Sequence, residues 1–184
     1  KNKQIPVSNH SISKAIVEGK TNIIAIDKAI NQFYKTGYLH NHLRMYIASM
    51  ACNVANSHWK IPAKWMYYHL TDADWASNAL SWQWVAGTNS NKKYVANQDN
   101  INKYSFSNQK NSFLDISYEA FSKLEIPEIL KDTPPIELIT PLPNKKEIVI
   151  NEKLPKMLDY MISSSADEMK ISKPRAYNIL CGRA

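Results

Sequence analysis

Several common signatures are missing from this 184-residue chain, and each absence excludes a class of protein. No run of eighteen apolar residues occurs, so the sequence predicts no membrane-spanning helix. The two cysteines, Cys52 and Cys181, form neither a disulfide framework nor a metal-site spacing, which favours a reducing, cytoplasmic setting. The five histidines show no HxxxH or HExxH spacing, so we expect no metal site. No GxGxxG, P-loop or GxSxG motif is present.

The N-terminus, KNKQIPVSNH, is polar and lacks both an initiator Met and the apolar core of a signal peptide. We therefore expect a fragment or a processed piece of a longer protein. The length suits one domain, and 44% hydrophobic with 21% charged residues is ordinary for a globular protein. A net charge of +7 favours contact with a polyanion, because clustered cations displace counterions from phosphate. A generally basic protein is the alternative, since no block of five like charges occurs.

Apolar periodicity predicts a helical first half. In the second predicted helix the buried stripe would be Leu43, Ile47, Met50 and Val54. Pro62 stands where a first-turn proline belongs. The predicted helices span residues 21–34, 39–56, 62–69 and 72–87, with Gly37 as a left-handed cap of the first and Thr71 or Asp72 as the N-cap of the last.

The second half is less regular. Residues 88–112 are rich in Asn, Lys, Ser and Gln, which predicts a long irregular connection. Asp115 is expected to cap a helix through Leu124. Five prolines between residues 126 and 143 break helices and predict an extended surface segment. A short strand is expected at 145–150, with helices around 154–163 and 166–171.

Two of the predicted helices carry polar and aromatic residues where an ordinary core would carry aliphatics. Asn41, Arg44 and Met45 project from one side of the second helix, at i, i+3 and i+4. Asp74, Asn78 and Trp82 form one stripe on the last helix, at i, i+4 and i+8. Unpaired buried polar groups cost about 1–3 kcal/mol each, so this stripe favours a planar ligand with donors and acceptors. A solvated amphipathic face, with Asp72 serving only as an N-cap, is the alternative.

These segments resemble the flavin-binding half of the DNA photolyase/cryptochrome family, in which GxxHNxLRM is followed by DxDxAxNxxxWQW. The resemblance covers roughly residues 20–105 and fades after Ser105. Residues 93–105, KYVANQDNINKYS, are more similar to the bacterial cryptochrome-like branches, and the lack of a four-cysteine set argues against the iron–sulfur branch. The matching residues are Gly37, His40, Asn41, Leu43, Arg44, Met45, Asp72, Asp74, Ala76, Asn78, Trp82, Gln83 and Trp84.

The resemblance implies an all-α fold, a helical bundle like the family's FAD-binding domain, followed by an extended proline-rich C-terminal segment. Residues 1–184 would form a single, partial FAD-binding domain. Within it, residues 20–105 would form the flavin-site core and residues 126–184 a C-terminal wrap. The upstream half of the catalytic domain would be missing from this chain.

The resemblance also implies roles for individual residues. Asn78 would face flavin N5, and Asp72 would pair with Arg44 beside the ring. Trp82 and Trp59 would relay electrons to the flavin. The outer relay tryptophan would fall near Pro6, where none stands. The implied FAD contacts are Asn41, Arg44, Asp72, Asp74 and Asn78, and the implied substrate contacts are Asn41, Met45 and Trp84. Substitutes for the missing relay tryptophan could be found among Tyr46, Trp65, Tyr67, Tyr68 and Trp75. For each of these aromatic residues, core packing is the alternative role.

The activity that the resemblance implies is light-driven repair of damaged DNA. A deoxyribodipyrimidine photo-lyase-like enzyme would split a flipped pyrimidine photoproduct by electron transfer from reduced FAD. His42 stands where dimer-repair enzymes commonly carry an arginine, which leaves the substrate class open. Two alternatives also stay open: a cryptochrome-like blue-light photoreceptor without repair activity, and a flavin-free helical interaction module.

Overall fold

The structure is a computed structural model that describes residue 4 and residues 7–90 and 92–139. The chain divides into two compact units, Lys1–Leu138 and Ile139–Ala184. Nearly all described residues belong to the first unit. The predicted strand at 145–150, the predicted helices at 154–163 and 166–171, and the wrap beyond residue 139 lie outside the described residues.

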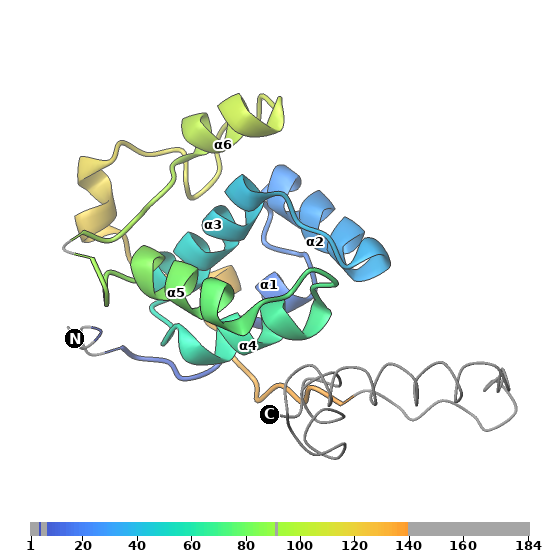
Figure 1. The fold of residues 1–184 in the computed structure, drawn as a ribbon. Coiled ribbons are helices and arrows are strands. Elements are labelled where there is room, and N and C mark those ends of the chain that lie inside the picture. Colours follow the sequence, from blue (N-terminus) through green and yellow to red (C-terminus); the bar gives the residue numbers. More distant parts are fainter. Residues whose placement is uncertain (1–3, 5–6, 91, 140–184) are drawn as a thin grey trace, which may run out of the picture. The chain divides into compact units, whose positions relative to one another are not determined.

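The first unit is helical, which confirms the all-α prediction (Figure 1). Its described residues contain no strand, and a single parallel β-bridge joins Asn9 to Ser57. None of the described helices is long and apolar enough to cross a membrane. The elements are α1 (Lys14–Val17), α2 (Ile24–Thr36), α3 (Asn41–Ser49), the π-helix η1 (Met50–Val54), α4 (Lys60–His69), α5 (Trp75–Val85), α6 (Gln98–Ser105) and the 3-10 turns η2 (Glu119–Lys123) and η3 (Glu128–Leu130).

Helix α2 starts three residues later than predicted and ends two residues later, at Thr36, directly before the predicted glycine cap. The Asp27 carboxylate accepts hydrogen bonds from the Thr21 and Asn22 backbone N–H groups at 2.7 and 3.0 Å. These bonds hold the chain in a turn before Ile24. At the other end Gly37 has φ of 66°, and its N–H donates to the Phe33 carbonyl at 2.7 Å. The predicted left-handed glycine cap is confirmed.

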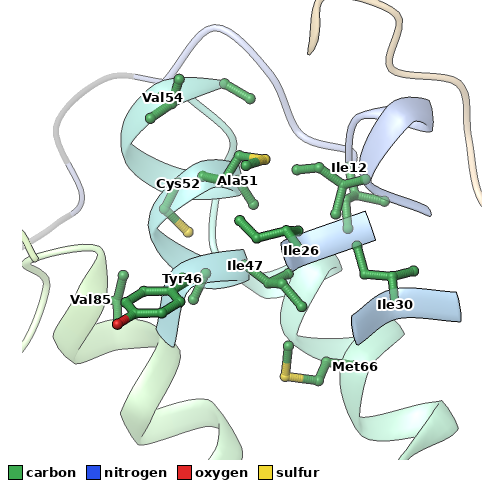
Figure 2. Close-up of a cluster of buried hydrophobic side chains, with 14 of the residues drawn as sticks. Ile12, Ile26, Ile30, Tyr46, Ile47, Ala51, Cys52, Val54, Met66 and Val85 are labelled. Carbon is green, nitrogen blue, oxygen red and sulfur yellow. The ribbon is translucent and has the colours of Figure 1, made fainter. Parts of the chain in front are cut away.

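The predicted helix 39–56 is two elements. It begins at Asn41, because Nδ1 of His40 accepts the His42 backbone N–H at 3.4 Å, and it changes from α3 to the π-helix η1 at Met50. Helix α3 contacts both α2 and α5, and Ile47 lies beside Ile26 and Ile30 of α2 (Figure 2). Ile47, Met50 and Val54 of the predicted stripe are buried, and Leu43 is half-buried.

Helix α4 carries Pro62 in its first turn, as predicted. The predicted start of the next helix is wrong. Asp74, and neither Thr71 nor Asp72, is the N-cap of α5, since Asp74 Oδ1 accepts the Ser77 N–H at 2.7 Å. Asp72 instead forms an ion pair with Arg44 at 2.8 Å.

The irregular connection predicted for residues 88–112 is also wrong, because it contains α6. Asn97 caps this helix, with Oδ1 accepting the Asn100 N–H at 3.0 Å. Its polar sequence hid it, since only Gln98 and Ile101 are buried. Asp115 caps no helix; its Oδ2 accepts the Asn111 N–H at 2.8 Å. Only the short turn η2 follows.

The last described segment packs against the start of the unit. Leu130 is fully buried, and residues 131–139 have no regular structure, as expected for the proline-rich stretch. The Ser11 hydroxyl donates to the Pro134 carbonyl at 2.6 Å, and the Lys14 N–H donates to the Asp132 carbonyl at 2.8 Å. Hydrogen bonds therefore join residues 11–14 to residues 130–134.

Candidate functional site

A pocket of about 630 Å³ is lined mainly by α3 and α5. It brings together every predicted site residue except Trp59. Amides, carboxylates and one arginine alternate with indoles and aliphatic side chains along its wall. The lining residues are Asn41, Arg44, Met45, Ala48, Met66, Leu70, Asp72, Asp74, Ser77, Asn78, Leu80, Ser81, Trp82, Trp84, Val85 and Asn89.

Arg44 is held at two points. Its Nε donates to the Leu39 carbonyl at 2.8 Å, and its Nη2 donates to both Asp72 carboxylate oxygens at 3.0 and 2.8 Å. The Arg44–Asp72 pair predicted from the sequence is therefore present. The two side chains are 25% and 53% exposed, so the pair contributes at most about 1 kcal/mol to stability and mainly fixes orientation. The N–H groups of Nη1 remain available to a ligand, since no described residue accepts a hydrogen bond from them.

Asn78 is oriented by a neighbouring helix. Its Nδ2 donates to the Ala63 carbonyl of α4 at 2.9 Å. A carbonyl only accepts, so the nitrogen must lie on that side and the amide oxygen on the other. No described residue donates to Oδ1, which leaves this oxygen as an acceptor in the pocket lining.

A polar edge follows the first turns of α5. Oδ1 of Asp74 is engaged as the N-cap, and no described residue donates to Oδ2. Ser77 and Ser81 also line the pocket, and sequence reasoning missed both. Their signal was the spacing: Ser77 follows the N-cap Asp74 by three positions, and Ser81 follows Asn78 by three positions on α5. Asn89, beyond the helix, gave no such signal.

Another part of the pocket lining is apolar. Trp82 is 2% exposed, whereas Trp84 is 45% and Leu80 56% exposed. The Trp84 ring lies 5.6 Å from the Tyr94 ring with a tilt of 33°. One buried indole therefore backs the pocket, and a second indole stands at its open side.

Asn53 positions this open side. Its Nδ2 donates to the Val85 carbonyl at 2.9 Å and to the Tyr94 carbonyl at 2.7 Å. The Tyr94 N–H also donates to the Val85 carbonyl at 3.0 Å. The end of α5 and the following segment are thus tied together beside Trp84. Sequence reasoning missed Asn53, because nothing in the sequence marks the π-helix that presents it.

Trp59 lies away from the pocket lining, half-buried before α4. Its backbone N–H donates to Gln4 Oε1 at 3.1 Å, and its ring lies 5.8 Å from the His58 ring. Burial, with His10 and Lys60 nearby, lowers the pKa of His58. The relay role of Trp59 stays a prediction.

The suggested substitute relay aromatics are scattered. Trp65 is 1% exposed, and its Nε1–H donates to the Tyr34 hydroxyl at 3.0 Å. Tyr46 is buried beside α6, and burial raises the pKa of its hydroxyl. Tyr67 and Trp75 pack edge to face, 5.3 Å apart. None of these residues lines the pocket.

Known proteins are similar to part of this sequence. The family model described as the FAD binding domain of DNA photolyase matches residues 1–157. The deoxyribodipyrimidine photo-lyase of Agrobacterium fabrum is 40% identical over 75 residues, 41% of this chain and 16% of that protein. That of Escherichia coli is 37% identical over 81 residues, 44% of this chain and 17% of that protein. Cryptochrome-1 of Arabidopsis thaliana is 33% identical over 75 residues, 41% of this chain and 11% of that protein.

The aligned part of the chain thus spans less than a fifth of each of these relatives. No solved structure matches the chain. The family match nevertheless covers most of the chain, and it includes every residue that lines the pocket. The chain therefore belongs to the family of the FAD binding domain of DNA photolyase, whose cofactor is FAD.

Proposed function

We propose that this chain forms the flavin-ring part of a light-driven, FAD-dependent deoxyribodipyrimidine photo-lyase that acts on damaged DNA. The observation that carries the proposal is one pocket in which an oriented amide, an Arg–Asp pair and two indoles meet. Relatives named deoxyribodipyrimidine photo-lyase match this stretch.

The pocket residues suit the flavin ring. A volume of about 630 Å³ is within the usual range for small-molecule pockets. Arg44 would donate to carbonyl oxygens, and Asp74 Oδ2 would accept from N–H or hydroxyl groups. Asn78 Oδ1 would accept from an N–H at flavin N5, which favours the reduced cofactor because the amide donor is already bound to Ala63. Bound FAD would supply an electron-donating ring that blue light excites.

The open side suits a flipped base. Met45 is half-buried, and Trp84 and Leu80 are largely exposed, so together they offer an apolar surface for stacking. Asn41, exposed on the first turn of α3, adds a donor and an acceptor at the rim. Buried Trp82 would deliver electrons toward the ligand, with Trp59 as the next donor.

A cryptochrome-like photoreceptor is the second candidate. Cryptochrome-1 of Arabidopsis thaliana matches a stretch of the same length as the A. fabrum enzyme does, at 33% identity. His42, in place of the arginine common in dimer-repair enzymes, leaves the substrate class open. The same flavin pocket would then serve light sensing without repair.

The test is an absorption spectrum of the purified chain supplied with FAD, recorded before and after blue light. We expect flavin bands that bleach, and slower bleaching in Trp82→Phe than in Phe33→Leu, which alters a buried ring outside the pocket lining and outside the suggested relay aromatics. A chain that takes up no FAD would contradict the proposal. Light-dependent restoration of an oligonucleotide with a pyrimidine dimer separates the enzyme from the photoreceptor.

A further inference from the structure

The exposed indole at the open side of the pocket, Trp84, contacts a tyrosine from the segment that follows α5. The Tyr94 ring lies 5.6 Å from the Trp84 ring with a tilt of 33°. Tyr94 is half-buried and packs against the hydrophobic core, whereas Trp84 is 45% exposed. Trp84 lines the pocket and Tyr94 does not. Tyr94 therefore restricts the motion of an indole that a ligand in the pocket would touch.

Asn53 fixes the backbone that carries both rings. Its Nδ2 donates to the Val85 carbonyl at 2.9 Å and to the Tyr94 carbonyl at 2.7 Å. The Tyr94 N–H donates to the same Val85 carbonyl at 3.0 Å. Val85 directly follows Trp84 in the chain. The orientation of the Tyr94 ring relative to the Trp84 ring is therefore set by a closed group of hydrogen bonds.

The fold accepts an unfavourable group in order to place this amide. Asn53 lies on the π-helix η1, where the Ala55 N–H donates to the Met50 carbonyl five positions earlier. Turns of this kind are rare and often occur at functional sites. Asn53 Oδ1 is buried, and no described residue donates to it, which lowers stability. An apolar side chain would avoid this loss, so the contribution of the amide is its two donated hydrogen bonds.

We propose that Asn53 and Tyr94 are positioning residues that hold the Trp84 indole in the orientation in which it stacks on a pyrimidine base entering the pocket. This inference rests on the proposed function and concerns two residues outside the pocket lining. An exposed side chain that becomes ordered only on binding lowers the affinity. Tyr94 orders the indole beforehand, so stacking on a base does not incur that loss.

The first measurement is fluorine NMR of the chain labelled with fluorotryptophan, in which Trp84→Phe identifies the Trp84 signal among those of the five tryptophans. Tyr94→Leu removes the ring and keeps the backbone hydrogen bonds. It should move the Trp84 signal toward its position in urea, whereas Tyr94→Phe should leave it in place. Tyr67→Leu is the matched control, because the Tyr67 ring lies 5.3 Å from that of Trp75, and neither residue lines the pocket. A Trp84 signal unchanged in Tyr94→Leu would overturn the proposal.

The second measurement compares two affinities in the dark, by fluorescence anisotropy, with FAD supplied. The probes are a labelled oligonucleotide that contains one thymine dimer and its undamaged copy. Tyr94→Leu should lower the ratio of the two affinities about two- to ten-fold, the range for ordering one side chain on binding. Tyr94→Phe and Tyr67→Leu should keep the ratio of the wild type.

A double-mutant cycle tests whether Tyr94 acts through Trp84. In the Trp84→Leu background, Tyr94→Leu should lower the affinity ratio no further, because the indole that it positions is gone. A further loss as large as that in the wild-type background would overturn the proposal. So would an unchanged affinity ratio in a Tyr94→Leu protein whose Trp84 signal has moved.

Asn53→Ala removes both donated hydrogen bonds and should reproduce the effects of Tyr94→Leu on the Trp84 signal and on the affinity ratio. Circular dichroism checks that each variant is folded, and Tyr94→Leu decides alone where Asn53→Ala does not fold. A preference for damaged DNA with no effect of Tyr94→Leu would contradict the positioning alone. A moved Trp84 signal in a chain whose wild type binds both oligonucleotides equally would contradict the proposed enzyme and the stacking on a base, and leave only the contact between the two rings.

Discussion

The side-chain amide of Asn78 makes a structural hydrogen bond with its nitrogen and offers its oxygen to a ligand. Its nitrogen donates to the Ala63 carbonyl at 2.9 Å, and its oxygen remains an acceptor in the pocket lining. Asn78→Asp replaces the donor with a carboxylate oxygen that faces a carbonyl oxygen. We expect a loss of about 1–3 kcal/mol in unfolding free energy, because the carbonyl of the buried residue Ala63 loses its partner. Urea unfolding of the two proteins measures it.

Asn89→Asp is the matched control. Asn89 lines the same pocket and also donates to a backbone carbonyl, that of Leu80 at 3.2 Å, but it is exposed. Water replaces the lost bond there, so the unfolding free energy should change little. Equal losses of unfolding free energy in Asn78→Asp and Asn89→Asp would mean that the hydrogen bond to Ala63 stabilises the fold no more than the exposed bond to Leu80 does.

Residues that share one helix could be predicted, and residues that meet across helices could not. Spacing alone placed Asp74, Asn78 and Trp82 on one stripe, and all three line the pocket. The partner that orients Asn78 is a backbone carbonyl fifteen positions earlier, on another helix. Sequence spacing within a helix contains no information about that contact.

At the scale of elements, Gly37 joins α2 to the segment that carries Asp72. The Thr71 N–H donates to the Gly37 carbonyl at 2.9 Å. A Cβ on Gly37 would stand 2.4 Å from Thr71 Cγ2, in a backbone with φ of 66°. We expect Gly37→Ala to cost about 1–3 kcal/mol for overpacking, in addition to the left-handed strain. Moving Thr71 should also displace Asp72 from Arg44 and weaken FAD uptake.

Gly87→Ala separates the two causes. Gly87 has φ of 74°, so its strain is similar, but its added Cβ would meet Lys93 Cγ at 3.1 Å, on a flexible side chain. Its loss of unfolding free energy should therefore be smaller than that of Gly37→Ala. Thermal or urea unfolding compares them, and a larger loss in Gly87→Ala would show that the Thr71 contact is not decisive.

The elements that sequence reasoning missed share a physical cause. Helix α6 buries only two of its eight residues, so it shows little of the apolar period by which a helix is recognised. The π-helix η1 differs from an α-helix only in its backbone hydrogen bonds, which join residues five positions apart instead of four. Its sequence, MACNV, resembles that of an ordinary apolar helix. Asp74 caps α5 because the helix begins at Trp75, and Asp72, two residues earlier, pairs with Arg44.

At the scale of the first unit, the chain near the N-terminus holds the segment before α4. The His58 N–H donates to the Asn9 carbonyl at 2.8 Å, Asn9 Nδ2 donates to the Ser57 hydroxyl at 2.8 Å, and Gln4 bonds Ser57 and Trp59. The His10 ring stacks 5.7 Å from the His58 ring. Protonating the His58 imidazole would place a positive charge in this contact.

Acid should therefore weaken the unit. Burial, His10 and Lys60 lower the pKa of His58, and burial lowers the pKa of His69, from an ordinary value of 6.5. Below 6.5 the unfolded chain binds more protons at these sites than the folded one, so stability rises with pH through this window. The contribution is fully present above 6.5 and is lost as pH falls toward the lowered folded pKa values.

Urea midpoints measured at about pH 8 and about pH 5.5 test this dependence. The midpoint of the wild type should fall at the lower pH. The double variant His58→Gln, His69→Gln should show a smaller fall, because glutamine binds no proton in either state. An equal fall in the two proteins would assign the acid sensitivity to other groups and remove His58 and His69 as its source.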